Sequence, residues 1–312
     1  MFIRSWLGYD RFVAPIMSQP TPITVFYRRS GRTFHEFLED SPATYESHPS
    51  KAKDQWLKAH PIYDWLSAVW QSTPWSARKI GPFVRKHRID MSEFEPGPYR
   101  SYAAFFDRRF LPGKRQFPTD ANQMGAFGEG RYFGWEALDP GMTFPIKGAA
   151  LEPKAILGRE DRVARFEGGP VILARLSPVD YHHLHYPDDG ILVDEDRLGK
   201  RLWTVNPTAL RNQPDILFRN ERYIQVLRTE HFGLLGFVEV GALSVGRIIQ
   251  VHRKDSRFRR GEEKSVFKFG GSAVVLFGQK GAWRPADDIL QHTSDGMETY
   301  LHLGEVIAHR VA

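Results

Sequence analysis

Three histidines lie within four consecutive positions in residues 177–190, Ser-Pro-Val-Asp-Tyr-His-His-Leu-His-Tyr-Pro-Asp-Asp-Gly. They are His182, His183 and His185, and imidazole is the side chain best suited to proton transfer near neutral pH. In an extended segment His183 and His185 would share a face, whereas in a helical turn His182 and His185 would align. A polar surface turn is an alternative interpretation. A metal site is another, but the His-x-x-His spacing lacks the other ligands of a complete set, so we expect no metal.

A serine preceded by two glycines stands at the start of an apolar run, in Gly270-Gly271-Ser272 followed by residues 273–277. Glycine tolerates positive φ and lets other groups approach the peptide bond closely. A strained Gly-Ser peptide bond with an exposed hydroxyl is what an N-to-O acyl shift requires. The same pattern also occurs where a strand has a bulge or a tight turn, so the motif alone leaves both interpretations open.

A third candidate is Asp120, in Phe117-Pro118-Thr119-Asp120. An aspartate after a proline is by itself a turn residue. It gains a chemical role if it orients a histidine, as the acid does in a Ser-His-Asp triad. The three candidate segments lie far apart in the sequence, so the fold must bring them together.

The secondary structure that must position these residues is predicted to change from mainly helical to mainly β along the chain. Three- and four-residue spacings predict a helical stripe formed by Trp56, Leu57, Ile62, Trp65, Leu66, Val69 and Trp70. Further helices are predicted after Thr73-Pro74 and over residues 102–110. Runs of β-branched and aromatic residues predict strands at residues 24–27, 223–227, 234–240, 245–251 and 273–277. The sequence therefore predicts an α+β fold, with a helical N-terminal region, residues 1–114, packed on a β-rich, mainly antiparallel body, residues 115–312.

The composition narrows the classes of protein to consider. The 312 residues include no cysteine, which excludes disulfides, thiolate nucleophiles and sulfur-based zinc sites. The net charge of +6 favours an anionic partner, but no nucleic-acid-binding module accompanies it, so we expect no nucleic acid. No apolar stretch approaches the ~20 residues that cross a bilayer, and the first residues do not form a secretory signal pattern. We expect a protein that is soluble or lies on a membrane surface.

Taken together, the three candidate segments resemble the phosphatidylserine decarboxylase family. The family's histidine motif, S-P-x-D-Y-H-x-x-H-x-P-x-x-G, is met by residues 177–190. Its self-cleavage motif is matched by Gly270-Gly271-Ser272-Ala273, and its P-A-D-G motif approximately by Pro118-Thr119-Asp120-Ala121. Similar segments follow the same order at residues 78–83, 89–94, 105–113, 219–223 and 238–246. The chain departs from the pattern at Ala273, where threonine is usual, and at Ala121, where glycine is usual.

The resemblance implies that the chain cuts its own backbone between Gly271 and Ser272. Asp120 would fix the tautomer of His185, and His185 would take the proton of the Ser272 hydroxyl. The oxygen would then attack the Gly271 carbonyl. The products would be a β chain, residues 1–271, and an α chain, residues 272–312.

The resemblance also implies a cofactor, a pyruvoyl group derived from Ser272 at the start of the α chain. This group would serve as the electron sink for decarboxylation. His182 would deliver a proton to carbon. His183 would be a surface residue or a contact to a substrate phosphate.

The substrate implied by the resemblance is phosphatidylserine, which would be converted to phosphatidylethanolamine. The expected partner is an anionic membrane surface at the cytoplasmic face, contacted by the helices and by an N-terminal anchor of Phe2, Ile3, Arg4, Trp6, Leu7, Arg11 and Phe12. A cytoplasmic protein whose helices pack on the body is the alternative. Other functions stay open: decarboxylation of a soluble amino acid such as tryptophan, an unprocessed scaffold or binding protein, and a His-ligated metal hydrolase. We also leave open whether the protein forms a homodimer.

Overall fold

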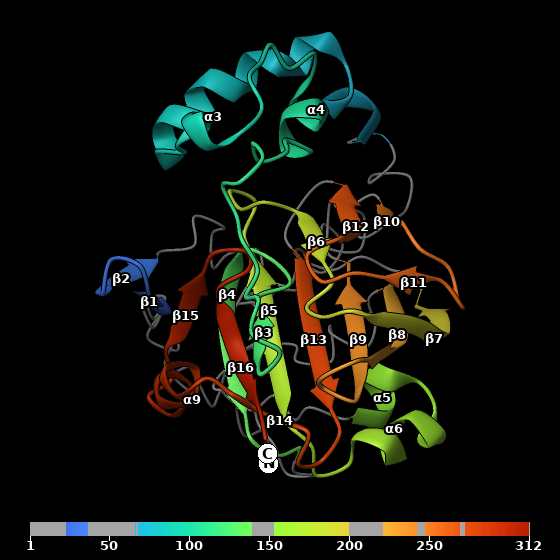
Figure 1. Ribbon diagram of the computed structural model, residues 1–312. Helices are drawn as coiled ribbons and strands as arrows, with labels where there is room; N and C mark the ends of the chain where they lie inside the picture. The colour runs from blue at the N-terminus through green and yellow to red at the C-terminus, as the bar shows by residue number, and fades with distance from the viewer. Residues whose placement is uncertain are drawn as a thin grey trace, which may run out of the picture.

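The computed structural model describes residues 23–36, 66, 68–138, 153–199, 221–241, 247–268 and 272–311. Within these ranges the protein has a β-rich body with a group of short helices above it (Figure 1). The expected N-terminal anchor and most of the helical stripe before residue 66 lie outside the described residues. None of the described helices is both long and apolar enough to cross a membrane.

The body is built on a ten-stranded sheet in the order β11-β7-β8-β9-β13-β5-β4-β15-β1-β2. Neighbouring strands are antiparallel, except that β1 and β15 run parallel. The bounds are β1 Ile23–Tyr27, β2 Arg32–Glu36, β4 Gly130–Trp135, β5 Val171–Leu176, β7 Gly190–Leu198, β8 Arg222–Thr229, β9 Leu234–Val240, β11 Arg257–Phe258, β13 Ser272–Gly278 and β15 Glu298–Leu301.

Two three-stranded antiparallel sheets complete the body, in the orders β10-β12-β6 and β14-β16-β3. Their strands are β3 Gln123–Gly125, β6 His183–His185, β10 Arg247–Gln250, β12 Glu263–Lys268, β14 Trp283–Pro285 and β16 Val306–Arg310. Three helices lie beside the sheets: α5 Pro153–Leu157, α6 Glu160–Phe166 and α9 Asp287–Ser294. The small sheet that contains β6 and β12 lies at the upper end of the large sheet in Figure 1.

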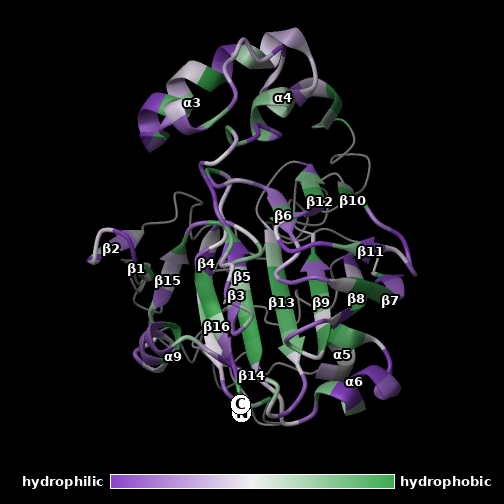
Figure 2. Ribbon diagram, in the orientation of Figure 1, coloured by the Kyte–Doolittle hydropathy of each residue, from purple (hydrophilic) through white to green (hydrophobic). Residues whose placement is uncertain are grey.

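The centre of the large sheet is its most apolar part. Every residue of β13, Ser-Ala-Val-Val-Leu-Phe-Gly, is buried, because β13 pairs on both sides and other elements cover its faces. Figure 2 shows the central strands, β13 among them, as predominantly hydrophobic. Burying β-branched and aromatic side chains in this way supplies the main driving force for the fold.

The helices above the body, here called the helical lobe, are η2 Pro74–Lys79, α3 Ile80–His87, η3 Met91–Glu93 and α4 Tyr102–Phe106. The Ser101 hydroxyl caps α4 by accepting a hydrogen bond from the Ala104 amide at 3.1 Å. The last two residues of α4, Phe105 and Phe106, are buried, whereas α3 has no buried residue. The lobe is therefore held mainly through α4.

The structure confirms an α+β fold with a mainly antiparallel sheet, and it confirms the predicted strands and the helix after Thr73-Pro74. The helix predicted over residues 102–110 ends earlier, at Phe106, because Phe110 forms a β-bridge and stacks its ring on Phe94. The described part of the expected helical region also contains β1 and β2, which belong to the large sheet. The N-terminal region therefore contributes strands to the body as well as helices.

Candidate active site

Ser272 is the first residue of β13, at the upper end of the large sheet. Its register partner on β5 is Leu176, the last residue of that strand, and the following Ala273 pairs with Val240 of β9. The residue is fully buried, contrary to the exposed hydroxyl expected from the motif. Within the described part of the chain, its Oγ has no hydrogen-bond partner. A buried hydroxyl without a partner costs free energy, and such groups in native proteins often have a chemical role.

The histidine motif begins where β5 ends, at the same end of the sheet as Ser272. Asp180 closes the turn there, because its carboxylate accepts a hydrogen bond from the Ser177 amide at 2.6 Å. The same carboxylate forms a buried ion pair with Arg131 of β4. The turn that leads into the histidines is therefore fixed to the large sheet by a buried charge pair.

His182 is buried beside the segment that leads to Ser272. Its Nδ1 donates a hydrogen bond to the Asp180 carbonyl at 3.0 Å, so in a neutral ring the proton is on Nδ1 and Nε2 is the basic nitrogen. Its ring packs against Phe106 of α4, with centroids 4.2 Å apart. Its carbonyl accepts a hydrogen bond from the Phe267 amide at 3.0 Å, five residues before Ser272.

His185 also has a defined tautomer. Its Nδ1 donates to the Gly261 carbonyl at 2.8 Å, and its Nε2 lies 3.2 Å from the Tyr181 hydroxyl. Burial lowers the pKa of His185, and the nearby His183 contributes in the same direction. At neutral pH the ring is therefore neutral, and its Nε2 can accept a proton.

His183 is not at the surface, contrary to one of the expectations from the motif. It is 2% exposed, because β6 pairs with β12 and the end of the helical lobe covers it. Its Nδ1 lies 2.9 Å from the Glu263 carboxylate, and its Nε2 lies 3.3 Å from the Asp107 carbonyl. His183 thus links a strand to the helical lobe.

The hydrogen bond expected between Asp120 and His185 is not formed among the described residues. The exposed Asp120 carboxylate instead accepts a hydrogen bond from the Asn122 amide at 2.8 Å, which closes its own turn. The turn nevertheless lies near His185. Arg260, the neighbour of Gly261, donates to the Asp120 carbonyl at 2.9 Å. A triad role for Asp120 stays a prediction.

Two buried cations near the site were not singled out from the sequence. Arg108, just after α4, donates to the carbonyls of Val179 and Asp180 at 2.6 and 3.2 Å, so it attaches the helical lobe to the histidine turn. Lys264 of β12 lies 2.7 Å from Glu239 of β9, and both side chains are fully buried. Burial lowers the pKa of Lys264. Such pairs cannot be recognised from local sequence, because the partners come from strands that only the fold brings together.

The described residues do not assemble a metal site. In the ranges that the structure covers, no group of three or more His, Asp or Glu side chains is arranged to hold a metal ion. His182 and His185, the pair with metal-ligand spacing, have different partners. The histidine motif offers proton-transfer groups at the same end of the large sheet as the buried Ser272 hydroxyl.

Comparison with known proteins agrees with this site. The model of the family described as phosphatidylserine decarboxylase matches residues 102–309. The phosphatidylserine decarboxylase proenzyme of Ruminiclostridium cellulolyticum is 35% identical over 255 residues, which cover 81% of this chain and 85% of that protein. The proenzyme of Clostridium botulinum strain Alaska E43 is 32% identical over 270 residues, covering 86% and 91% of the two chains. The chain belongs to the phosphatidylserine decarboxylase family.

Proposed function

We propose that this chain cleaves itself between Gly271 and Ser272 and then decarboxylates phosphatidylserine to phosphatidylethanolamine. The observation that carries the proposal is the buried, unpartnered Ser272 hydroxyl at the same end of the sheet as the histidine motif. The names of the relatives support the substrate and the existence of a precursor.

In the proposed self-cleavage, His185 takes the proton of the Ser272 hydroxyl, and Oγ attacks the Gly271 carbonyl carbon. The peptide C–N bond breaks, and an ester to Oγ replaces it. Loss of the Ser272 Cα proton and cleavage of the Cβ–O bond then release the Gly271 carboxylate and leave dehydroalanine. Tautomerisation and hydrolysis consume one water, release ammonia and give a pyruvoyl group.

The surroundings of Ser272 fit such a group. The first position of β13 is buried and paired with Leu176 of β5, so a carbonyl formed there would be shielded from bulk water. Once formed, the pyruvoyl group would supply the electron sink for loss of the substrate carboxyl group. His182 is the proposed proton donor to carbon, with Nδ1 fixed on the Asp180 carbonyl and Nε2 as the working nitrogen. The proposed role of Asp120 requires its carboxylate to exchange the Asn122 amide for His185.

The proposed function is tested by incubating the purified protein with vesicles that contain phosphatidylserine. We expect phosphatidylethanolamine and CO₂ to form, measured by lipid mass spectrometry and CO₂ release. Free serine and free tryptophan serve as parallel substrates. Turnover of a free amino acid without turnover of the lipid would favour the soluble-substrate alternative. An intact chain with no turnover of either would favour the scaffold alternative.

We further propose that the helical lobe places the protein on an anionic membrane surface, the cytoplasmic leaflet being the expected one. Large apolar side chains are exposed on the lobe and on the helical turn before it: Leu66, Val69, Trp70 and Trp75 are 46 to 66% exposed. Cations lie over the two tryptophans, Lys79 over Trp70 at 4.0 Å and Arg78 over Trp75 at 4.4 Å. Exposed tryptophan beside basic residues is typical of a surface that enters the headgroup region of a bilayer.

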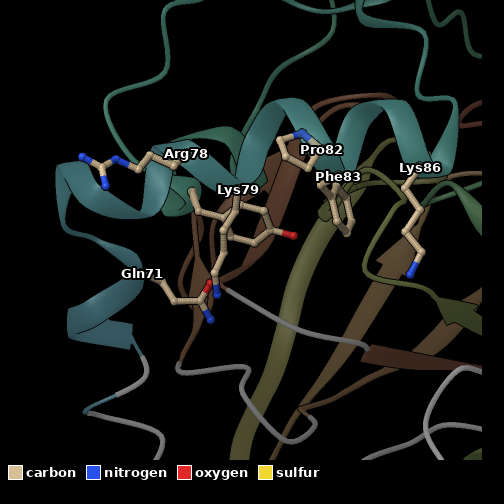
Figure 3. A pocket seen from close by; sticks show the side chains of 7 residues that line it. Gln71, Arg78, Lys79, Pro82, Phe83 and Lys86 are labelled. Atoms are coloured by element: carbon tan, nitrogen blue, oxygen red, sulfur yellow. The ribbon is translucent and has the colours of Figure 1, made fainter.

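A pocket of about 570 Å³ lies on the same lobe and adds to this surface. It is lined by Gln71, Arg78, Lys79, Pro82, Phe83, Lys86 and Tyr102. In Figure 3 the labelled side chains of residues 78–86 project from η2 and α3, and Gln71 projects from the helical turn before them. The basic groups lie on either side of Pro82 and Phe83. Three cations and no acid in the lining favour an anionic lipid headgroup as its occupant.

Replacing Arg78, Lys79 and Lys86 together by alanine is expected to weaken binding to phosphatidylserine-containing vesicles. Each basic residue near an anionic surface contributes ~1 kcal/mol, so the expected loss is on the order of 100-fold. Vesicle co-sedimentation at low and at physiological salt measures the change. The matched control replaces three exposed cations in and before β11: Arg253, Lys254 and Arg257.

Two results would contradict the membrane proposal. Equal weakening by both triple variants would mean that net charge, and not the lobe, governs binding. Lipid-independent dimers that the lobe variant disrupts, measured by light scattering, would instead make this face a contact between two copies of the chain.

A further inference from the structure

Ion pairs join β12, the strand that precedes the cleavage site, to the end of the helical lobe. Asp107, the residue after α4, forms an ion pair with Lys268, the last residue of β12. Both side chains are about two-thirds buried or more. Lys268 ends β12 only four residues before Ser272, so its partner bears on where the chain leaves the strand toward the cleavage site.

The other end of β12 is tied to the same stretch of the lobe. Arg109 forms a two-fold contact with the Glu263 carboxylate, with its Nη2 3.2 Å from Oε1. The His183 ring bridges the two attachments, with one nitrogen against Glu263 and the other against the Asp107 carbonyl. We call these five residues the charged clasp: Asp107, Arg109, His183, Glu263 and Lys268.

The Glu263 carboxylate of the clasp remains charged over the whole physiological pH range. Burial alone would raise the pKa of Glu263, but hydrogen bonds from His183 and Arg109 outweigh it and hold the pKa at about 2. The pairing of Glu263 with Arg109 therefore does not depend on pH in this range.

The chain beyond the cleavage site is held by a different part of the molecule. Ser272 enters the large sheet at once, paired with Leu176 of β5, and Ala273 pairs with Val240 of β9. The Gly271–Ser272 bond thus lies in a short span whose ends are attached to separate supports, the clasp before it and the large sheet after it. An intramolecular attack depends steeply on such placement, since a displacement of about 1 Å can cost ~100-fold in rate.

We propose that Asp107 is a positioning residue for self-cleavage, and that it acts by holding Lys268. The inference rests on the proposed self-cleavage at Ser272. Among the described residues, the Asp107 carboxylate pairs with Lys268 and contacts none of Ser272, His182 and His185, so its effect is on geometry. The Asp107–Lys268 ion pair acts before the Gly271–Ser272 bond is cut, because cleavage separates the residues after Lys268 from β13.

The test follows self-cleavage of the full chain during pulse-labelled cell-free synthesis, with the cleaved fraction measured over time. We expect Asp107→Lys and Lys268→Asp each to slow cleavage on the order of 10-fold, less than the ~100-fold limit for a displacement of about 1 Å. The double variant Asp107→Lys/Lys268→Asp restores the ion pair with reversed polarity and is expected to recover most of the rate. A loss of general stability would not be rescued in this way.

Two further variants distinguish the effect of the Asp107–Lys268 pair from effects of surface charge and of lower stability. Asp161→Lys makes the same substitution in α6, at an exposed ion pair with the preceding Arg159, and it should leave the cleavage rate unchanged. If Asp107→Lys lowers the melting temperature of the uncleavable Ser272→Ala precursor, Asp107→Asn is measured in its place, and slower cleavage is again expected.

Cleavage of the Asp107 variant at the wild-type rate, or a double variant no faster than either single one, overturns the inference. These outcomes leave the proposed function intact, because the wild-type chain still cleaves. A wild-type chain that never cleaves would instead overturn the proposed function, and this inference with it.

Discussion

Replacing Ser272 by alanine is expected to leave the protein as a single 35.9 kDa chain without decarboxylase activity. The variant lacks the oxygen that attacks the Gly271 carbonyl, and no other described hydroxyl occupies the start of β13. Intact-mass spectrometry distinguishes the outcomes. The wild type should give two fragments, and the one formed by residues 272–312 should be lighter by one ammonia than a chain that begins with serine.

Two companion variants sharpen this measurement. Ser294→Ala removes a serine hydroxyl on α9 that donates to the Gln291 carbonyl at the surface, and it should process normally. Ser272→Cys keeps a nucleophile at the first position of β13 and should still cleave, at a different rate. If the alanine variant still splits after Gly271, the nucleophile has been misassigned.

Substitutions of His185 and His182 are expected to impair different steps, self-cleavage and decarboxylation respectively. His185→Gln is expected to slow self-cleavage by ~10²–10⁴-fold, the usual contribution of a general base. His182→Gln is expected to leave cleavage nearly intact and to reduce decarboxylation by a similar factor. Cleavage is read from intact mass, and decarboxylation from product formed per processed chain.

In both rings Nδ1 donates to a main-chain carbonyl, so Nε2 is the basic nitrogen of the neutral ring. Burial lowers the pKa of His185, so its base form persists at pH values below the ordinary histidine range. Self-cleavage should therefore fall only when the pH drops below this lowered pKa. His309→Gln, at an exposed position of β16, is the matched control. A His185→Gln chain that processes at the normal rate would exclude it as the base.

The α+β class and several strands could be predicted because local residue patterns determine them. The run at 273–277 is apolar throughout, and it forms the buried central strand β13. The joining of β1 to β15 could not be predicted, because it is a parallel pairing between distant parts of the chain. The early end of α4 depends on the contact of Phe110 with Phe94, which local periodicity does not reveal.

For the candidate site, too, the sequence identified the residues but not the partners of their side chains. The resemblance predicted that Ser272 acts together with the histidine motif, and the main-chain hydrogen bond from Phe267 to His182 joins the strand before Ser272 to that motif. The partners of the side chains could not be deduced. His185 is oriented by the Gly261 carbonyl, and His183 is buried against Glu263, both groups lying about 80 residues further along the chain.

The position of β13 in the middle of the large sheet has a consequence for the processed protein. The proposed cut would fall immediately before this strand, which is flanked by β9 and β5. The smaller product would also carry β15 between β1 and β4, and β16 between β14 and β3. The two products would thus form an obligate heterodimer whose interface is the hydrophobic core itself. Exchange of chains between molecules would require unfolding. The two chains cut from one precursor would therefore stay together in the same molecule.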